Sequence, residues 1–252
     1  MARILINAAG GGAGRVIAKA FLDAGDQVMA CDIAPEGLDA LRAEYPQLQT
    51  RVGDAADEKD VAAVFDQMMS AFGGIDVLVN NVGIAGPTAL LEDISLEEWN
   101  ASLAANLTSH FLFARAAVVP MKAQGSGLIV NISSGSAKVG LPRRTPYVVS
   151  KGAVLSLTQN LARELGPYGL RANAILPGAI RGERIERVIK AKAEALDIAP
   201  EAYERDMLKY ISMRTMVDPE DIAAMVQFLA SPQGARISGQ MIGVDGNIEW
   251  EE

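Results

Sequence analysis

Short runs of β-branched and other apolar residues alternate along this chain with longer stretches in which apolar residues recur three and four positions apart. This alternation predicts repeated strand–helix–strand units, which build a parallel sheet covered by helices on both faces. The runs that fit strands are 4–8, 27–32, 47–52, 76–81, 128–133, 171–176 and 240–244, and the helical stretches include 13–24, 58–72, 96–123, 146–165 and 219–230. We therefore expect an α/β fold, a doubly wound parallel sheet of about seven strands, formed by residues 1–252 as one domain.

Residues 182–214 interrupt this alternation, because two charged amphipathic stretches stand where one short crossover would suffice. We interpret the segment as a small helical lid over the substrate site. A charge-rich helical pair is also typical of a solvated outer layer, so that alternative stays open. In an open parallel sheet, ligands bind beyond the carboxyl ends of the strands, and functional residues are expected just after each strand.

The overall charge and the scarcity of Cys and His exclude several classes of function. The formal net charge is -8, with Lys and Arg scattered, which disfavours nucleic acid and membrane surfaces as partners. Cys31 is the only cysteine and His110 the only histidine, so a multi-cysteine or two-histidine metal site is excluded and no metal is expected. A lone histidine in a helical pattern is usually structural. With no secretory leader pattern at the N-terminus, we expect a cytoplasmic protein.

A glycine-rich turn follows the first predicted strand and leads directly into a helix. It reads Gly10, Gly11, Gly12, Ala13, Gly14. Glycines allow close approach of the backbone to a pyrophosphate, and the amides of the helix start attract its charge. Asp32 ends the second strand 18 positions after Gly14, where a carboxylate accepts hydrogen bonds from the adenosine ribose and repels a 2′-phosphate. The pair predicts a dinucleotide site of the Rossmann type that favours NAD over NADP, although a glycine-rich turn alone, or Asp32 as a helix cap, would be structural.

Further polar residues follow the third and fourth strands. Asp54 is placed to accept from the adenine amine, and Asn80, Asn81 and Gly83 follow the fourth strand. The two asparagines either face the cofactor or bond neighbouring backbone, and the sequence leaves both possibilities open.

A tyrosine and a lysine four positions apart carry the predicted chemistry. Tyr147 and Lys151 project from one face at the start of an apolar helix, and Ser133 and Ser134 end the fifth strand just before it. A free tyrosine ionises near pH 10. A cation about 4 Å away stabilises a phenolate by about 4 kcal/mol at an effective dielectric near 20. Tyr147 is therefore a candidate general acid or base, with Ser134 binding the substrate oxygen. A surface Tyr and Lys on an ordinary helix is the structural alternative.

With these residues the chain resembles the short-chain dehydrogenase/reductase family in its compact form, from Arg3 to about Asn247. Asn80–Gly83 resembles the NNAG segment, Tyr147 to Lys151 matches YxxxK, and Pro177 with Gly178 matches the PG turn. The 13 positions between Ser134 and Tyr147 select Ser134 over Ser133 as the catalytic serine. The resemblance implies the catalytic set Asn106, Ser134, Tyr147 and Lys151, and the NAD-binding set Gly10, Gly11, Gly12, Ala13, Gly14, Asp32, Ile33, Asp54, Ala55, Asn81, Gly83, Tyr147, Lys151, Pro177, Gly178 and Ile180.

In the roles that the resemblance implies, Tyr147 transfers a proton, Lys151 also binds the nicotinamide ribose, and Asn106 holds a water. It also implies a homotetramer, with a dimer as the alternative. The chain departs from the family pattern at four places: Asn7 and Ala8 replace the Thr and first Gly of TGxxxGxG, Val82 replaces an alanine, and Gly182 stands where a threonine is common.

Arginines gather near the expected substrate mouth. Arg143 and Arg144 precede Tyr147, and Arg181, Arg184 and Arg187 follow the PG turn. Because guanidinium fits carboxylate and phosphate bidentately, we expect Arg144 and Arg184 to contact the substrate, which is then an anionic alcohol or carbonyl compound; an oligomer interface is the other use of such arginines. The function predicted is hydride transfer between NAD(H) and a secondary alcohol or ketone. The alternatives are an NADPH-dependent 3-oxoacyl thioester reductase and a non-catalytic nucleotide sensor.

Overall fold

The computed structural model describes residues 1–248, without the side chains of Arg184 and Ala195. Within this range a single parallel sheet has the order β3-β2-β1-β4-β5-β6-β7. Its strands are β1 (Arg3–Asn7), β2 (Gln27–Asp32), β3 (Gln49–Val52), β4 (Val77–Asn80), β5 (Gly127–Ile132), β6 (Leu170–Pro177) and β7 (Met241–Val244). The strand order reverses between β1 and β4, which creates the switch point at which ligands bind in such sheets. The predicted α/β doubly wound fold is confirmed.

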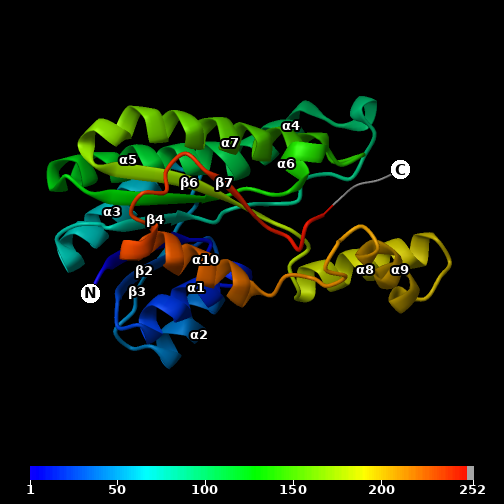
Figure 1. Cartoon of the computed structure of the whole chain (residues 1–252), viewed down its shortest axis with the longest axis horizontal. Coiled ribbons are helices and arrows are strands. Elements are labelled where there is room, and N and C mark those ends of the chain that lie inside the picture. Colours follow the sequence, from blue (N-terminus) through cyan, green and yellow to red (C-terminus); the bar gives the residue numbers. More distant parts are fainter. Residues whose placement is uncertain (249–252) are drawn as a thin grey trace.

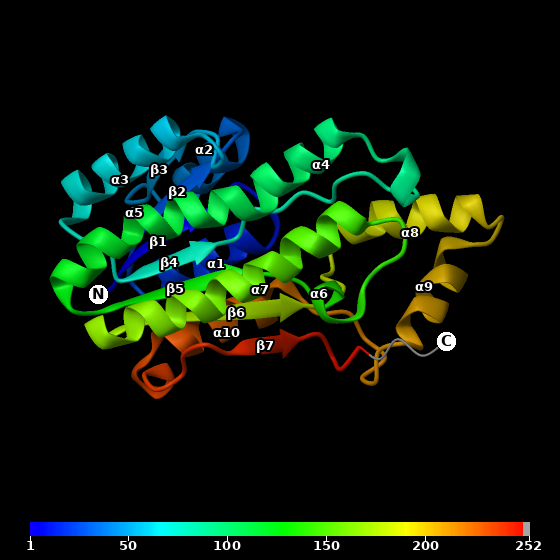
Figure 2. The ribbon, with the colours of Figure 1, turned by 90° about the horizontal axis from the view of Figure 1, so that it is seen from above.

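Helices cover both faces of the sheet (Figures 1 and 2). They are α1 (Gly12–Asp23), α2 (Pro35–Glu44), α3 (Glu58–Phe72), α4 (Leu96–Leu103), α5 (Ser109–Gln124), α6 (Ser136–Val139), α7 (Thr145–Leu165), α8 (Glu183–Ala195), α9 (Pro200–Leu208) and α10 (Pro219–Ala230). Short 3-10 turns lie at η1 (Leu91–Asp93), η3 (Gly166–Tyr168) and η4 (Pro232–Gly234). No helix in residues 1–248 is long and apolar enough to cross a membrane.

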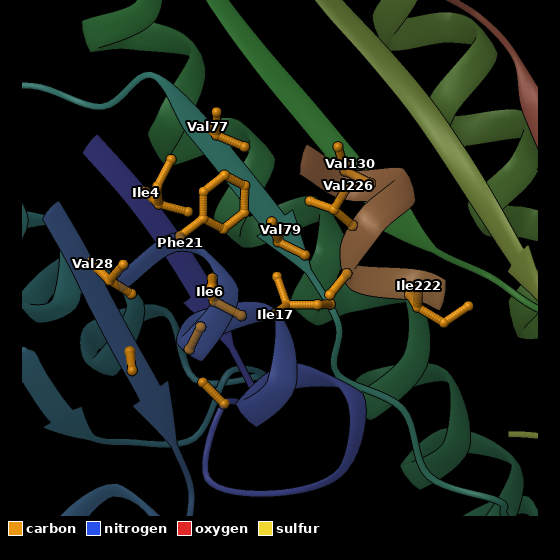
Figure 3. Packing of buried hydrophobic residues seen from close by; sticks show 14 of the residues in the cluster. Ile4, Ile6, Ile17, Phe21, Val28, Val77, Val79, Val130, Ile222 and Val226 are labelled. Carbon is orange, nitrogen blue, oxygen red and sulfur yellow. The ribbon is translucent and has the colours of Figure 1, made fainter. Parts of the chain in front are cut away.

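The two faces of the sheet form separate hydrophobic cores, because successive residues of a strand point to opposite sides. Ile4 and Ile6 of β1 pack with α1, α2 and α10, and Figure 3 shows Ile17, Phe21 and Ile222 in this layer. Leu5, between them, packs on the other side with residues of α3 and α5. A strand whose middle residues are buried on both faces reads as an apolar run, which is why the sequence located β1.

The predicted helix 96–123 is present as one continuous helical run from Leu96 to Gln124. It consists of α4, the π-helical segment η2 (Ala104–Thr108) and α5, so the prediction missed only the π turn inside it. A π turn holds one more residue per hydrogen-bonded ring than an α turn. Asn106 lies in this turn with its side-chain amide bonded to the backbone of Ile84. The apolar spacing continues on both sides, so the pattern located the helix but not the π turn.

The segment 182–214 folds as α8 and α9, which pack against each other beyond the carboxyl ends of the strands (Figures 1 and 2). A parallel β-bridge between Ile180 and Val217 joins the chain segment that leads into this helical pair to the segment that follows it. Ile189 and Ala193 are buried side chains on the inner face of α8. The helical pair therefore stands at the edge of the sheet where ligands are expected.

Candidate functional site

The start of α1 presents free backbone amides. Gly11 is the N-cap residue, no side chain caps the helix, and the first turn holds no acidic residue. Other helices of the same molecule are capped by their own side chains: Asp57 accepts from two amides of α3, and Ser95 forms a capping box on α4. The unfilled amides and the positive end of the helix dipole suit a pyrophosphate.

Two small residues shape the backbone of this turn. Ala8 adopts φ +50, a left-handed conformation that normally calls for glycine and is the position of the family's first glycine. Gly14 lies directly against it, because a Cβ at Gly14 would come within 2.2 Å of the Ala8 carbonyl oxygen. The methyl group of Ala8 thus leaves the turn intact but holds it in a strained conformation.

A pocket of about 340 Å³ adjoins the turn and is lined by Ala8, Gly10, Gly11, Asp32, Ala34 and Gly37. Asp32 Oδ2 accepts from the Gly10 amide at 2.8 Å, which fixes the carboxylate at the pocket wall. Gly37, at the start of α2, was not predicted from the sequence. A Cβ there would lie 2.1 Å from the Gly10 carbonyl oxygen, so only glycine lets α2 approach the turn.

The remaining predicted cofactor residues lie along the same edge of the sheet. Ile33 is exposed after Asp32, and the Gly53 amide donates to the Asp32 carbonyl, which brings Asp54 and Ala55 beside it. Asp54 Oδ1 accepts from the Ala56 amide at 2.8 Å.

At the opposite end of the site, Pro177 ends β6, and a Cβ at Gly178 would lie 2.8 Å from Asp245 Cα. The bridge to Val217 uses the Arg181 amide and the Ala179 carbonyl. The N–H and C=O groups of Ile180 itself therefore face away from Val217.

A row of buried asparagines crosses the sheet beneath the turn. Asn7 Nδ2 donates to Asn80 Oδ1 at 2.8 Å, and Asn80 Nδ2 donates to Asn131 Oδ1 at 2.9 Å. Asn7 Oδ1 accepts from the amides of Asn81 and Val82, and Asn81 Nδ2 donates to the Ala8 carbonyl at 3.0 Å. These contacts are to protein groups, which favours the structural interpretation that the sequence left open for Asn80 and Asn81.

Lys151 lies where β4 and β5 end. Its side chain is 3% exposed, and Nζ donates to the Ile132 carbonyl at 2.9 Å and to the Val82 carbonyl at 3.3 Å. A Cβ at Gly83 would lie 2.9 Å from this ammonium group, so the glycine makes room for it. Two carbonyl oxygens replace the water that a buried cation loses. Lys151 thus carries its charge into the site one helical turn from Tyr147.

The two serines after β5 differ in their partners. Ser133 Oγ donates to the Lys151 carbonyl at 2.8 Å and ties the strand to α7. Ser134 Oγ takes no part in that bond to Lys151 and lies 3.0 Å from Ser136 Oγ. This difference supports the selection of Ser134, rather than Ser133, as the residue available to a substrate.

Asn106 is fully buried and bonded on three sides. Its Oδ1 accepts from the Ile84 amide at 2.7 Å, and its Nδ2 donates to the Ile84 carbonyl and to Ser150 Oγ. Ser150 in turn donates to the Tyr147 carbonyl at 2.8 Å. Asn106 and Ser150 therefore connect the segment after β4 to the first turn of α7, and Ser150 was not identified from the sequence.

His110 is structural, as a lone histidine in a helix usually is. Its side chain is 0% exposed, and Nε2 lies 3.1 Å from the Val82 carbonyl that also receives Lys151. Burial, together with the nearby Lys151 ammonium, lowers the pKa of His110 to about 3. The ring is neutral near pH 7 and donates to Val82 through Nε2.

The arginines that were expected near the substrate have different surroundings in the structure. Arg144 stacks over Tyr147, with its guanidinium carbon 5.4 Å from the ring centroid, and Arg181 pairs with Asp218. Arg143 and Arg187 are exposed. The side chain of Arg184 lies outside the described part of the structure.

The fold and this arrangement define a nicotinamide-dependent oxidoreductase architecture, and a family model described as enoyl-(acyl carrier protein) reductase matches residues 8–247. The chain belongs to the short-chain dehydrogenase/reductase family. Among its relatives, a 3-oxoacyl-(acyl-carrier-protein) reductase of Thermotoga maritima is 34% identical over 248 residues, which are 97% of this chain and 96% of the relative.

Two solved structures resemble the fold closely. An NAD+-bound xylitol dehydrogenase has a TM-score of 0.90 at 28% identity, covering 96% of this chain and 97% of its own. A sorbitol-6-phosphate 2-dehydrogenase of Erwinia amylovora has a TM-score of 0.90 at 27% identity, covering 96% of this chain and 98% of its own.

Proposed function

We propose that this protein transfers a hydride between NAD(H) and a secondary alcohol or ketone, with Tyr147 as the general acid or base. The observation that carries the proposal is the buried Lys151 ammonium, held by the Val82 and Ile132 carbonyls one helical turn from the phenol. Such a cation stabilises the phenolate without leaving the site, and so readies Tyr147 to exchange a proton with a substrate oxygen.

Each member of the catalytic set then has a distinct task. Ser134 donates a hydrogen bond to the substrate oxygen, Tyr147 takes or gives its proton, and Lys151 stabilises the phenolate and binds the nicotinamide ribose. Asn106 holds the backbone of Ile84 and, with Ser150, the first turn of α7. The nicotinamide, when bound, accepts or supplies the hydride.

The choice of NAD rests on Asp32. Its carboxylate lines the pocket beside the glycine-rich turn and would repel a 2′-phosphate. The cations Arg15 and Lys19 of α1 both pair with Glu44 instead of offsetting that charge. The NAD+-bound xylitol dehydrogenase of the same fold is consistent with this choice.

The test is a panel of secondary alcohols, polyols and hydroxy acids assayed with NAD and NADP, comparing the wild type with Tyr147→Phe. We expect NAD-linked turnover and a loss of about 10²- to 10⁴-fold in kcat for the variant. An unchanged circular dichroism spectrum and melting temperature of the variant are the control for its folding. Full turnover by Tyr147→Phe would refute the proposed mechanism.

Two other functions are distinguished by the same assays. A 3-oxoacyl thioester reductase is favoured by the relative from Thermotoga maritima and would prefer NADPH in the coenzyme titration. A nucleotide-sensing protein would bind NADH and turn over none of the panel.

We also propose a cytoplasmic homotetramer. Large apolar side chains on the outer sides of α5 and α7 support assembly: Phe111 is 45% exposed, Val119 72% and Val149 43%. Light scattering of the purified protein measures the number of subunits, and cell fractionation tests the location.

A further inference from the structure

Among the arginines near the carboxyl edge of the sheet whose side chains the structure describes, Arg144 lies against the Tyr147 ring. Its side chain is half-buried, and its guanidinium lies over the Tyr147 ring, 5.4 Å from the centroid. Arg181 instead pairs with Asp218 at 3.0 Å. The Arg144 cation is therefore within the length of a short carbon chain from the hydroxyl to which the proposed function assigns proton transfer.

A backbone contact fixes this guanidinium relative to the catalytic residues. Arg144 donates to the Ala85 carbonyl at 2.8 Å. The segment 83–85 that carries this carbonyl also contacts Lys151 and Asn106, so one short piece of backbone positions all three side chains. A cation held this firmly loses little further side-chain entropy when it binds a ligand.

The start of α7 concentrates positive potential at the same place. Arg144 is the N-cap residue of α7, and the first turn contains no acidic residue. A cation at this end faces the positive pole of the helix dipole, which is locally unfavourable. In contrast, α3, α4 and α10 begin with acidic residues in their first turns. Violations of a local rule are expected at functional sites, where they serve a ligand.

We propose that Arg144 binds a carboxylate or phosphate group of the substrate, whose hydroxyl or carbonyl oxygen meets Tyr147. This inference rests on the proposed function and narrows its substrate class to hydroxy acids, keto acids and phosphorylated alcohols. The planar guanidinium matches either anion with two parallel hydrogen bonds, and the short span to the phenol places the anionic group a few bonds from the reacting carbon.

The test compares matched pairs of charged and neutral substrates: 2- and 3-hydroxycarboxylates with their methyl esters, and polyol phosphates with their parent polyols. The wild type should prefer the charged member. Arg144→Gln should lower kcat/KM for charged members 10- to 100-fold more than for neutral ones, since a hydrogen bond to a charged group is lost. Arg163→Gln makes the same change in charge on an exposed part of α7 and should leave the ratio unchanged.

Equal losses for charged and neutral substrates in Arg144→Gln would mean that Arg144 acts only by positioning Tyr147, and would overturn the proposal. A wild type without preference for charged substrates would also overturn it. Calorimetric titration of the charged panel members into the enzyme–NADH complex needs no turnover. Binding that is weakened in Arg144→Gln supports the anion site even if hydride transfer fails, whereas no binding by the wild type contradicts it.

Discussion

His110 should make the fold sensitive to mild acid. Its ring is fully buried in the folded protein, where burial and Lys151 lower its pKa to about 3, against about 6.5 in an unfolded chain. Below pH 6.5 the unfolded chain therefore binds a proton at His110 that the folded protein does not bind. The contribution of neutral His110 to the free energy of unfolding is complete above pH 6.5 and is lost progressively as the pH falls toward 3.

The size of this effect follows from proton linkage. Each pH unit between the two pKa values costs about 1.4 kcal/mol, so about 3 kcal/mol is lost by about pH 4.5. This is a large share of the roughly 5–15 kcal/mol that stabilises a typical domain. Acidic residues act in a lower range: Arg3 holds the pKa of Asp76 below its ordinary value, so that contribution persists until the pH falls below the usual carboxylate range.

The assay is urea unfolding followed by circular dichroism at several pH values between about 7.5 and 4.5, at one protein concentration. His110→Gln keeps an N–H donor for the Val82 carbonyl but does not titrate. The wild type should lose about 3 kcal/mol more than the variant over this range. His110→Asn serves as a second variant. Identical pH slopes for wild type and variants would refute the assignment of the acid sensitivity to His110.

Two further predictions concern the glycine-rich turn. Ala8→Gly should raise the free energy of unfolding by about 1 kcal/mol, because it removes the strain of φ +50, and thermal unfolding measures it; a loss of stability would contradict that view. Gly37→Ala places a Cβ 2.1 Å from the Gly10 carbonyl and should weaken NADH binding at least about 10-fold in a fluorescence titration, whereas unchanged affinity would show that α2 moves without disturbing the pocket.

The sheet was largely predictable because the central strands β1, β2, β4, β5 and β6 are buried on both faces and read mostly as apolar runs, whereas the edge strands β3 and β7 are partly exposed. The predicted bounds of β2, α3 and α10 agree with the structure, and those of the other strands differ from it by at most two residues at each end. The helix α2 was missed because only Leu38 and Leu41 are buried along it, too few to establish a period. Local pattern thus located the elements with continuous burial and also the two edge strands, and it missed α2, where burial is sparse.

In the site, the identities of the reactive residues were predictable and their supports were not. The spacing of Tyr147 and Lys151 is a property of one helix turn, which sequence expresses directly. The contact of Asn7 with Asn80 spans 73 positions and that of Asn80 with Asn131 spans 51. These partners meet only because the strand order places β1, β4 and β5 side by side, and no local pattern encodes a strand order.

The two departures at the start of the glycine-rich turn explain each other. A left-handed alanine costs about 1 kcal/mol and persists only where its surroundings determine its conformation. Here the neighbouring Asn7 accepts from the amides of Asn81 and Val82, and Asn81 donates back to the Ala8 carbonyl. These three hydrogen bonds fasten the turn to the segment after β4 and offset the strain. Asn7 Nδ2 also donates to Asn80 Oδ1, so the Asn7 amide uses both its acceptor and its donor to hold the turn beside β4. Asn7 and Asn81 together therefore hold the turn, so the asparagine at the first departure helps to hold the left-handed alanine at the second.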